Sequence, residues 1–172
     1  MAVNTALKKI TSTIDTVSTW SGKIFSVATV VVVAVIFYEV VARYAFHAPA
    51  EWSNEAMIYG CAIVYLMGGA WALKNGQHLK MELLYSRLSI RGKAIIDSFT
   101  YFFFVLYLGF FIWAAGKYAW RSWLINETTG SAWDPPAYPL KILMVLGASL
   151  VLIQGTAKFI RDAYLAVTGR EL

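Results

Sequence analysis

Residues 24–43 read IFSVATVVVVAVIFYEVVAR, an apolar run whose charged side chains, Glu39 and Arg43, stand near its end. An α-helix of about 20 apolar residues is long enough to cross the roughly 30 Å hydrocarbon core of a bilayer. We therefore expect a transmembrane helix here. Three further apolar runs predict transmembrane helices at 55–73, 95–118 and 139–160.

The composition of the whole chain agrees with a membrane protein. Of the 172 residues, 59% are hydrophobic and 15% are charged, whereas a soluble domain carries about 25% charged residues. The four apolar runs leave little room for anything else, so we expect one all-α integral membrane domain over residues 1–172. Cys61 is the only cysteine, which excludes a disulfide within this chain.

The distribution of positive charge predicts the topology, because lysine and arginine concentrate on the cytoplasmic side of membrane proteins. Most of the 15 lysines and arginines lie in the N-terminal tail, the middle loop and the C-terminal tail. We therefore expect both termini and the middle loop in the cytoplasm, with the first run as an uncleaved signal anchor. This topology explains the net charge of +5, so membrane lipid is an expected partner and nucleic acid is not.

Two polar segments have the pattern of amphipathic helices. In residues 7–20, apolar side chains recur at three- and four-residue spacing, which suits a helix lying on the membrane surface. The alternative for this segment is a polar extension of the first transmembrane helix. Residues 78–91 alternate charges with leucines, and we expect a short amphipathic helix there, in the cytoplasmic loop.

The second and third runs differ in how they are expected to pack. The second run carries Gly60, Gly68 and Gly69, and small residues let helices approach closely in lipid. We expect these glycines to pack against a neighbouring helix. The third run is crowded with aromatic residues on most of its faces, which favours broad contact with lipid or with a large partner.

The ionisable residues of the apolar runs are candidates for function. Glu39 and Arg43 are one helical turn apart, in the favourable order for an ion pair. The pair is either an anchor for the end of the helix or a contact point for another subunit. Asp97, near the start of the third run, and Gln154, late in the fourth, are expected to be structural, with Gln154 bonding a neighbouring helix.

Catalytic and cofactor chemistry is not expected. His47 and His78 are the only histidines and lie in loops, whereas paired axial ligands of a membrane haem would have to lie within the spans. No cluster of residues has the spacing of a metal site, and no nucleophile stands beside a base. We therefore expect no enzyme activity, no cofactor, no metal site and no substrate-binding site in this chain.

With the spans placed, three motifs stand out in the connections of the chain. The first lies between the first two helices, the second follows the second helix, and the third precedes the last helix. They consist of Arg43, Tyr44, Phe46, Pro49, Trp52 and Glu55; Gly68, Ala72, Leu73, Lys74, His78, Glu82 and Leu83; and Trp133, Asp134, Pro135 and Pro136. Together they resemble one family, the small membrane subunit of tripartite ATP-independent periplasmic (TRAP) transporters, the DctQ-like family. Asn54 departs from the pattern, because family members often carry a second acid there.

The resemblance implies a role in a sodium-coupled uptake system of the bacterial inner membrane. In such systems a soluble periplasmic protein delivers an organic anion, often a carboxylate, and a large membrane subunit holds the substrate and sodium sites. This chain would be the small scaffold subunit, which braces the large subunit and helps to dock the binding protein. The expected partner interface is then Glu39, Arg43, Tyr44, Phe46, Trp52 and Glu55, with Trp133, Asp134, Pro135 and Pro136 in the outer loop.

Two alternatives remain open at the level of sequence. Small proton-coupled multidrug antiporters can also have four helices and a glutamate in the first. The position of Glu39 towards the end of its span, and the strong charge bias, count against this alternative. The other is a membrane assembly or scaffold protein with no role in transport.

Overall fold

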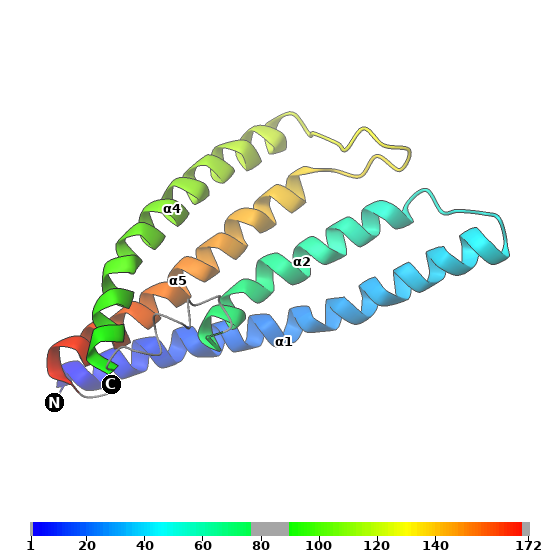
Figure 1. The fold of residues 1–172 in the computed structure, drawn as a ribbon. Helices are drawn as coiled ribbons and strands as arrows, with labels where there is room; N and C mark the ends of the chain where they lie inside the picture. Colours follow the sequence, from blue (N-terminus) through cyan, green and yellow to red (C-terminus); the bar gives the residue numbers. More distant parts are fainter. Residues whose placement is uncertain (1, 77–89, 170–172) are drawn as a thin grey trace.

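The chain folds into four long helices. The computed structural model describes residues 2–76 and 90–169, which contain α1 (Ala2–Ala45), α2 (Ser53–Lys74), α4 (Ile90–Leu124) and α5 (Tyr138–Thr168) (Figure 1). All four are long and apolar enough to cross a membrane. The expectation of an all-α protein with four helices able to cross a membrane is therefore confirmed for the described part of the chain.

The helices form a row in the order α1, α2, α5, α4 (Figure 1). Both chain termini lie at one end of the row, which we call the termini end. The α1–α2 turn, residues 46–52, and the α4–α5 loop, residues 125–137, lie at the other end, which we call the hairpin end. Over most of their length the helices thus form a layer one helix thick rather than a closed bundle, and near the termini end α5 also packs against α1.

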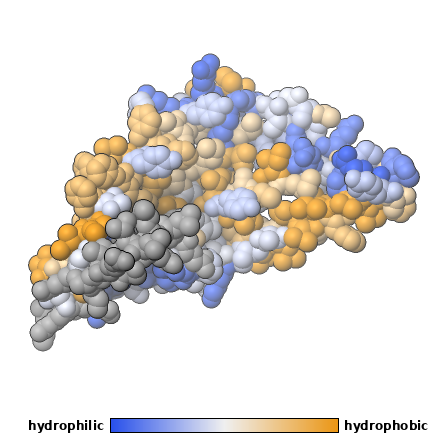
Figure 2. Space-filling view, viewed as in Figure 1, coloured by the Kyte–Doolittle hydropathy of each residue, from blue (hydrophilic) through white to orange (hydrophobic). Residues whose placement is uncertain are grey.

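A layer one helix thick leaves most of its side chains exposed. Of the 18-residue apolar stretch that marks the span in each helix, 28% is buried in α5, which packs against the three other helices. The buried share is 11% in α1 and also in α2. Hydrophobic residues spread across the middle of the visible face, while strongly hydrophilic residues gather towards the hairpin end (Figure 2). The aromatic residues of α4 are exposed, as expected: Phe99, Phe102, Phe103, Tyr107, Phe110 and Trp113.

The N-terminal segment differs from the expectation of a helix separate from the first span. Residues 7–20 and 24–43 both lie within α1, which runs without a break for 44 residues and contains no proline that would interrupt it. Its polar side turns inwards: Thr11 and Ser18 are buried, whereas Ile10 and Val17 are about half exposed. At about 1.5 Å per residue, α1 is roughly 66 Å long, twice the thickness of a bilayer core.

The other helices have the following limits. Helix α2 matches the expected span closely, whereas α4 starts five residues earlier and α5 ends eight residues later than the spans at 95–118 and 139–160. Pro139 lies in the first turn of α5, where its missing N–H costs nothing. Gly169 closes α5 in the left-handed conformation, with φ of 68°. Of the expected amphipathic helix, residues 90 and 91 belong to α4, and 78–89 lie outside the described residues.

Two of the three glycines of α2 pack as expected and the third does not. A Cβ atom at Gly60 would lie 2.3 Å from Val32 of α1, and one at Gly69 would lie 3.1 Å from Val151 of α5. A Cβ atom at Gly68 would meet no other atom within 4 Å. The expectation that Gly68 packs against a neighbouring helix is therefore wrong, because Gly68 points to open space beside α1.

A polar network at the termini end ties α1 to α5. Asp15 accepts hydrogen bonds from Gln154 (2.9 Å) and from Arg161 (2.6 Å), and Ser18 donates to Gln154 (2.6 Å). Gln154 is 1% exposed. The expectation that Gln154 bonds a neighbouring helix is confirmed.

Two lysines extend the network to the remaining helices. Lys158 of α5 forms ion pairs with Asp97 of α4 and with Asp162 of its own helix. Lys74 of α2 donates to the hydroxyl of Thr19 on α1 at 2.5 Å. Asp97 thus has the structural role that its position indicated, and side chains of all four helices meet at this end.

Candidate functional site

The α1–α2 turn is organised by the carboxylate of Glu39. One oxygen, Oε1, accepts hydrogen bonds from Nε (3.0 Å) and Nη2 (2.5 Å) of Arg43, so the structure forms the ion pair that the one-turn spacing predicts. The other oxygen, Oε2, accepts from the backbone N–H of Ala50 at 3.1 Å. Glu39 is 5% exposed, and its negative charge is neutralised within the chain by Arg43.

Further hydrogen bonds complete the α1–α2 turn. The N–H of Ala48 donates to the carbonyl of Ala42, and the hydroxyl of Ser53 donates to the carbonyl of Ala50. His47 has a φ of 54°, in the left-handed region that non-glycine residues rarely adopt. Pro49 fixes the backbone between these contacts. The chain is therefore held in one path from α1 into α2.

The side chains around the turn face outwards. The Arg43 side chain is 54% exposed although its guanidinium is paired, and Tyr44 and Phe46 are each 74% exposed. Trp52 stacks on Tyr38, with ring centroids 5.6 Å apart. The turn thus exposes the guanidinium of Arg43 and the rings of Tyr44 and Phe46. The ring of Trp52, in contrast, packs against Tyr38 of α1.

The α4–α5 loop is closed by its own hydrogen bonds. The N–H of Thr129 donates to the carbonyl of Pro135, and the N–H of Ala137 donates to the carbonyl of Glu127. The side chain of Asp134, whose φ is 49°, accepts from the N–H of Gly130 at 2.8 Å. The loop is therefore a folded structure, with Pro135 buried within it.

An ion pair fixes the loop to α5. Lys141 donates to Glu127 at 2.5 Å, and its ammonium lies 3.8 Å from the centre of the Tyr118 ring on α4. The hydrogen bond from Lys141 holds the pKa of Glu127 below its usual value of 4.5. Glu127 is therefore ionised at neutral pH.

The two connections of the hairpin end are joined through α2. The hydroxyl of Thr129 donates to Oε1 of Glu55 at 3.0 Å, and the hydroxyl of Tyr59 donates to the carbonyl of Pro136 at 2.6 Å. Glu55 is 8% exposed, and its second oxygen, Oε2, has no hydrogen-bond partner within the described residues. Hydrogen bonds thus connect the start of α2 to the α4–α5 loop.

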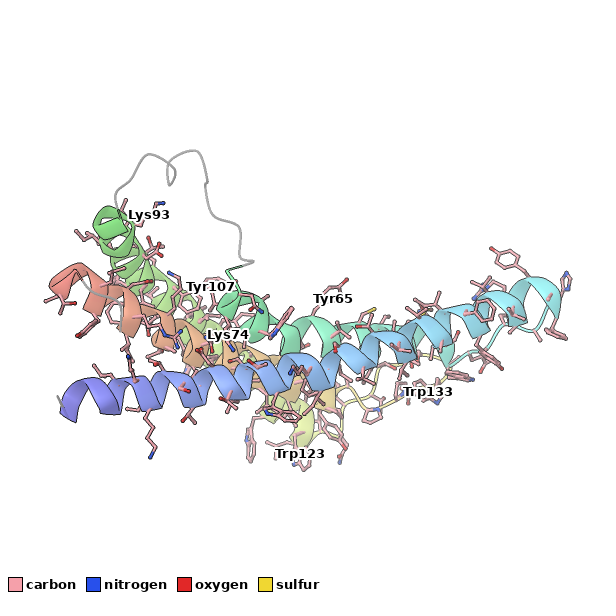
Figure 3. The ribbon with its side chains drawn as sticks, turned by 90° about the horizontal axis from the view of Figure 1, so that it is seen from below. Tyr65, Lys74, Lys93, Tyr107, Trp123 and Trp133 are labelled. Atoms are coloured by element: carbon pink, nitrogen blue, oxygen red, sulfur yellow. The ribbon has the colours of Figure 1, made fainter. Side chains whose placement is uncertain are left out.

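The remaining motif residues divide between the two ends. Trp133 is 49% exposed and lies on the loop towards the hairpin end, whereas Lys74 lies at the other end, in the polar network (Figure 3). His78 and Glu82 lie outside the described residues. The structure therefore brings the first and third motifs together and places the start of the second motif far from them.

The arrangement is suited to contact rather than to chemistry. Among residues 2–76 and 90–169, no three His, Cys, Asp or Glu side chains stand close enough to hold a metal ion. The carboxylates of Glu39, Glu55, Glu127 and Asp134 accept bonds from their own chain. The exposed groups around the α1–α2 turn include the guanidinium of Arg43 and the rings of Tyr44 and Phe46. Such side chains are enriched in protein interfaces.

A family model for the DctQ component of tripartite ATP-independent periplasmic transporters matches residues 32–164, well over half of the chain. The chain belongs to the DctQ family. Among individually curated proteins, no sequence matches it. The matched range begins within α1 and ends within α5, so it contains the hairpin end and α2 and α4 entirely.

Membership of the DctQ family establishes the general role of the chain. It is the small membrane subunit of a TRAP transporter, and the family is a transporter component rather than an enzyme family. The four apolar helices and the family together indicate a multi-pass protein of the inner membrane.

Sequence patterns did not reveal several residues that hold this DctQ chain together. Thr129 and Tyr59 are ordinary polar side chains, and nothing local links them to Glu55 or to Pro136, more than 70 residues away in each case. Asp15 was a better candidate, because it is an acid in the segment 7–20, whose pattern predicts an amphipathic helix. Its partner Arg161 lies 146 residues away, and only the fold brings the two together.

Proposed function

We propose that this DctQ chain is the scaffold of a sodium-coupled TRAP transporter that takes up an organic anion. In this proposal it braces the large membrane subunit and helps to dock the periplasmic binding protein. Its hairpin end faces the periplasm and its termini end faces the cytoplasm, as the distribution of lysine and arginine indicates.

The observation that carries the proposal is the construction of the hairpin end. Glu39 and Glu55 each fix a connection by hydrogen bonds, and these contacts leave Arg43, Tyr44 and Phe46 exposed. Arginine and aromatic residues dominate the energetics of protein interfaces, and a rigid surface loses little entropy when a partner binds. The hairpin end therefore has the properties of a docking surface.

Bracing of the large subunit is supported by the shape of the chain. A layer one helix thick exposes broad apolar faces, and the exposed rings of α4 form part of one of them. In lipid, helices associate through packing rather than through a hydrophobic driving force. A large membrane subunit can pack against such a face over a wide area without any polar groove between the two.

Transport of the anion itself is assigned to the large subunit. Glu39, Gln154 and Ser18 are buried polar side chains within the helices, and each bonds to other groups of the chain. A substrate or sodium site would require polar groups turned towards a shared cavity. The substrate is expected to be a carboxylate or a sulfonate, because systems of this kind take up organic acids.

The test is a sodium-driven uptake assay in vesicles that contain the large subunit with or without this chain. We expect accumulation of the substrate only when both membrane subunits are present. A surface test uses Arg43→Ala, which should weaken docking of the binding protein while the membrane complex still copurifies. Equal uptake in the absence of this chain would contradict the scaffold role.

The alternative of a proton-coupled antiporter is disfavoured by the surroundings of Glu39. An exchanging carboxylate must release and bind protons as substrates come and go. Here the carboxylate accepts bonds from Arg43 and from the Ala50 N–H, at the hairpin end of α1. The pair is far from the middle of any span, where such a site would be needed.

A further inference from the structure

A groove runs between α1 and α2 in the half of the molecule that is nearer the termini end. Its volume is about 370 Å³. Helix α1 contributes Gly22, Phe25 and Thr29 to its walls, and α2 contributes Val64, Gly68 and Trp71. The lining of the groove is therefore mostly apolar.

The groove is open at Gly68 because this residue has no side chain to fill the space beside α1. A Cβ atom at Gly68 would meet no other atom within 4 Å, which makes Gly68 the open floor. Close contacts hold the helices in place beside it. The hydroxyl of Ser21 donates to the carbonyl of Met67 at 2.8 Å, and the ring of Trp71 lies against Gly22.

The end of the groove nearest the termini is polar and positively charged. Lys23 lines this end, is exposed, and forms no ion pair with any described residue. The indole of Trp71 is 38% exposed beside it. An ammonium and an amphipathic ring in this arrangement can bind an anionic group at the boundary between water and lipid.

The groove lies within the depth of one leaflet of a bilayer. Lys23 is 22 residues from Ala45 at the hairpin end of α1, which corresponds to about 33 Å and so to the opposite boundary of a hydrocarbon core. From Lys23 the groove continues to Thr29, about 9 Å towards the middle of the membrane. Its charged end is thus at headgroup depth, and its apolar part is at acyl-chain depth.

We propose that this groove binds one anionic phospholipid from the leaflet at the termini end. The phosphate binds Lys23, and one acyl chain lies along the groove over Gly68. This site is separate from the docking surface at the hairpin end and goes beyond the proposed scaffold role.

A lipid fits the groove better than a helix of a partner protein does. A helix of a partner protein that packs here through an apolar face would cover Lys23 without neutralising its charge, which is unfavourable. A lipid phosphate neutralises that charge.

The test measures lipid retained by the full chain after reconstitution in vesicles of phosphatidylcholine and phosphatidylglycerol. Native mass spectrometry then counts the phospholipid bound to each variant. Gly68→Leu places a side chain in the groove, at a position where a Cβ atom meets no other atom within 4 Å, and should lose the bound phosphatidylglycerol. Lys23→Gln should retain it about fivefold less, the effect expected for one lysine near an anionic lipid.

The matched control is Gly109→Leu, because Gly109 of α4 also faces open space but lines no part of the groove. We expect it to retain phosphatidylglycerol like the unmodified chain, and circular dichroism should show equal helix content in all variants. Equal retention by Gly68→Leu, or equal retention of phosphatidylcholine, would overturn the proposal. So would loss of the lipid when the large subunit is present, with crosslinks from that subunit into the groove.

Discussion

Thr129 of the α4–α5 loop donates a hydrogen bond to Glu55 in the first turn of α2, across 3.0 Å and 74 positions of sequence. Glu55 is the acid that the first family motif contributes, and the loop holds the residues of the third motif. The two motifs are therefore parts of one surface. The contact also gives Glu55 a role within the chain, in addition to any contact with a partner.

Removing this contact should loosen the loop. In Thr129→Val, the buried carboxylate of Glu55 loses the donor to Oε1, which costs about 1 kcal/mol. We expect the amides of residues 127–137 to exchange hydrogen roughly fivefold faster. A loss of about 1 kcal/mol raises the equilibrium constant for local opening of the loop by about that factor. Hydrogen exchange with mass spectrometry measures it. Thr128→Val is the control, and an equal effect of both substitutions would show that the contact contributes nothing.

Both carboxylate oxygens of Glu39 should stabilise the α1–α2 turn. Glu39→Ala removes the acceptor for Arg43 and for the Ala50 N–H, whereas Glu39→Gln keeps an acceptor for one of them. We expect thermal unfolding in detergent to occur at a lower temperature in Glu39→Ala than in Glu39→Gln. The exposed neighbour Glu51 provides the control, Glu51→Ala, which should unfold like the unmodified chain. A stable Glu39→Ala would show that the turn is held by its backbone contacts alone.

The loop should respond to acid through Glu127. Its pKa is lowered by the bond from Lys141, and a carboxyl group with a lowered pKa stabilises the folded state at a pH above its unfolded value. That stabilisation is lost as the pH falls through the pKa of the folded state. We expect the protection of the loop from hydrogen exchange, corrected for intrinsic rates, to be constant near neutral pH and to decrease below 4.5.

The matched variant for this measurement is Glu127→Gln, which cannot ionise. Its loop should be less protected at neutral pH and should show no further decrease through the acidic range. An acid transition of the same size in Glu127→Gln would assign the transition to another group.

The exposed rings of the α1–α2 turn should contribute to docking. Tyr44→Ala and Phe46→Ala together remove two side chains that are each 74% exposed and make no ring contact in this chain with a described residue. We expect the binding protein to bind the membrane complex about tenfold more weakly, as loss of interface anchors commonly does. Phe37→Ala is the control, because Phe37 is 70% exposed but lies within the span. Unchanged affinity in the double variant would place docking elsewhere.

The sequence was sufficient for the spans and for some of the polar contacts. Four apolar runs predicted four helices, and the one-turn spacing predicted the Glu39–Arg43 pair, because both depend on residues that are close in sequence. The continuity of α1 was only an alternative, since the apolar stripe of residues 7–20 suits either arrangement. The packing of Gly68 was predicted wrongly, because small size shows that a helix can approach and not that one does.

The contacts that organise the hairpin end were beyond prediction from one sequence. The contact of Thr129 with Glu55 depends on the order of the helices in the row, and the contact of Lys141 with Glu127 depends on the path of the α4–α5 loop. That order is set by the packing of all four helices together. Local patterns of charge and hydrophobicity do not contain it.

The arrangement in a single layer has a consequence for how this subunit is handled. A closed bundle carries its own core, but this layer has two outer surfaces, and its contacts within the chain bury only part of each helix. The environment therefore supplies a large part of the packing that stabilises the protein. Isolated in detergent, the subunit should be the fragile member of its transporter, and lipid or the large subunit should restore its stability.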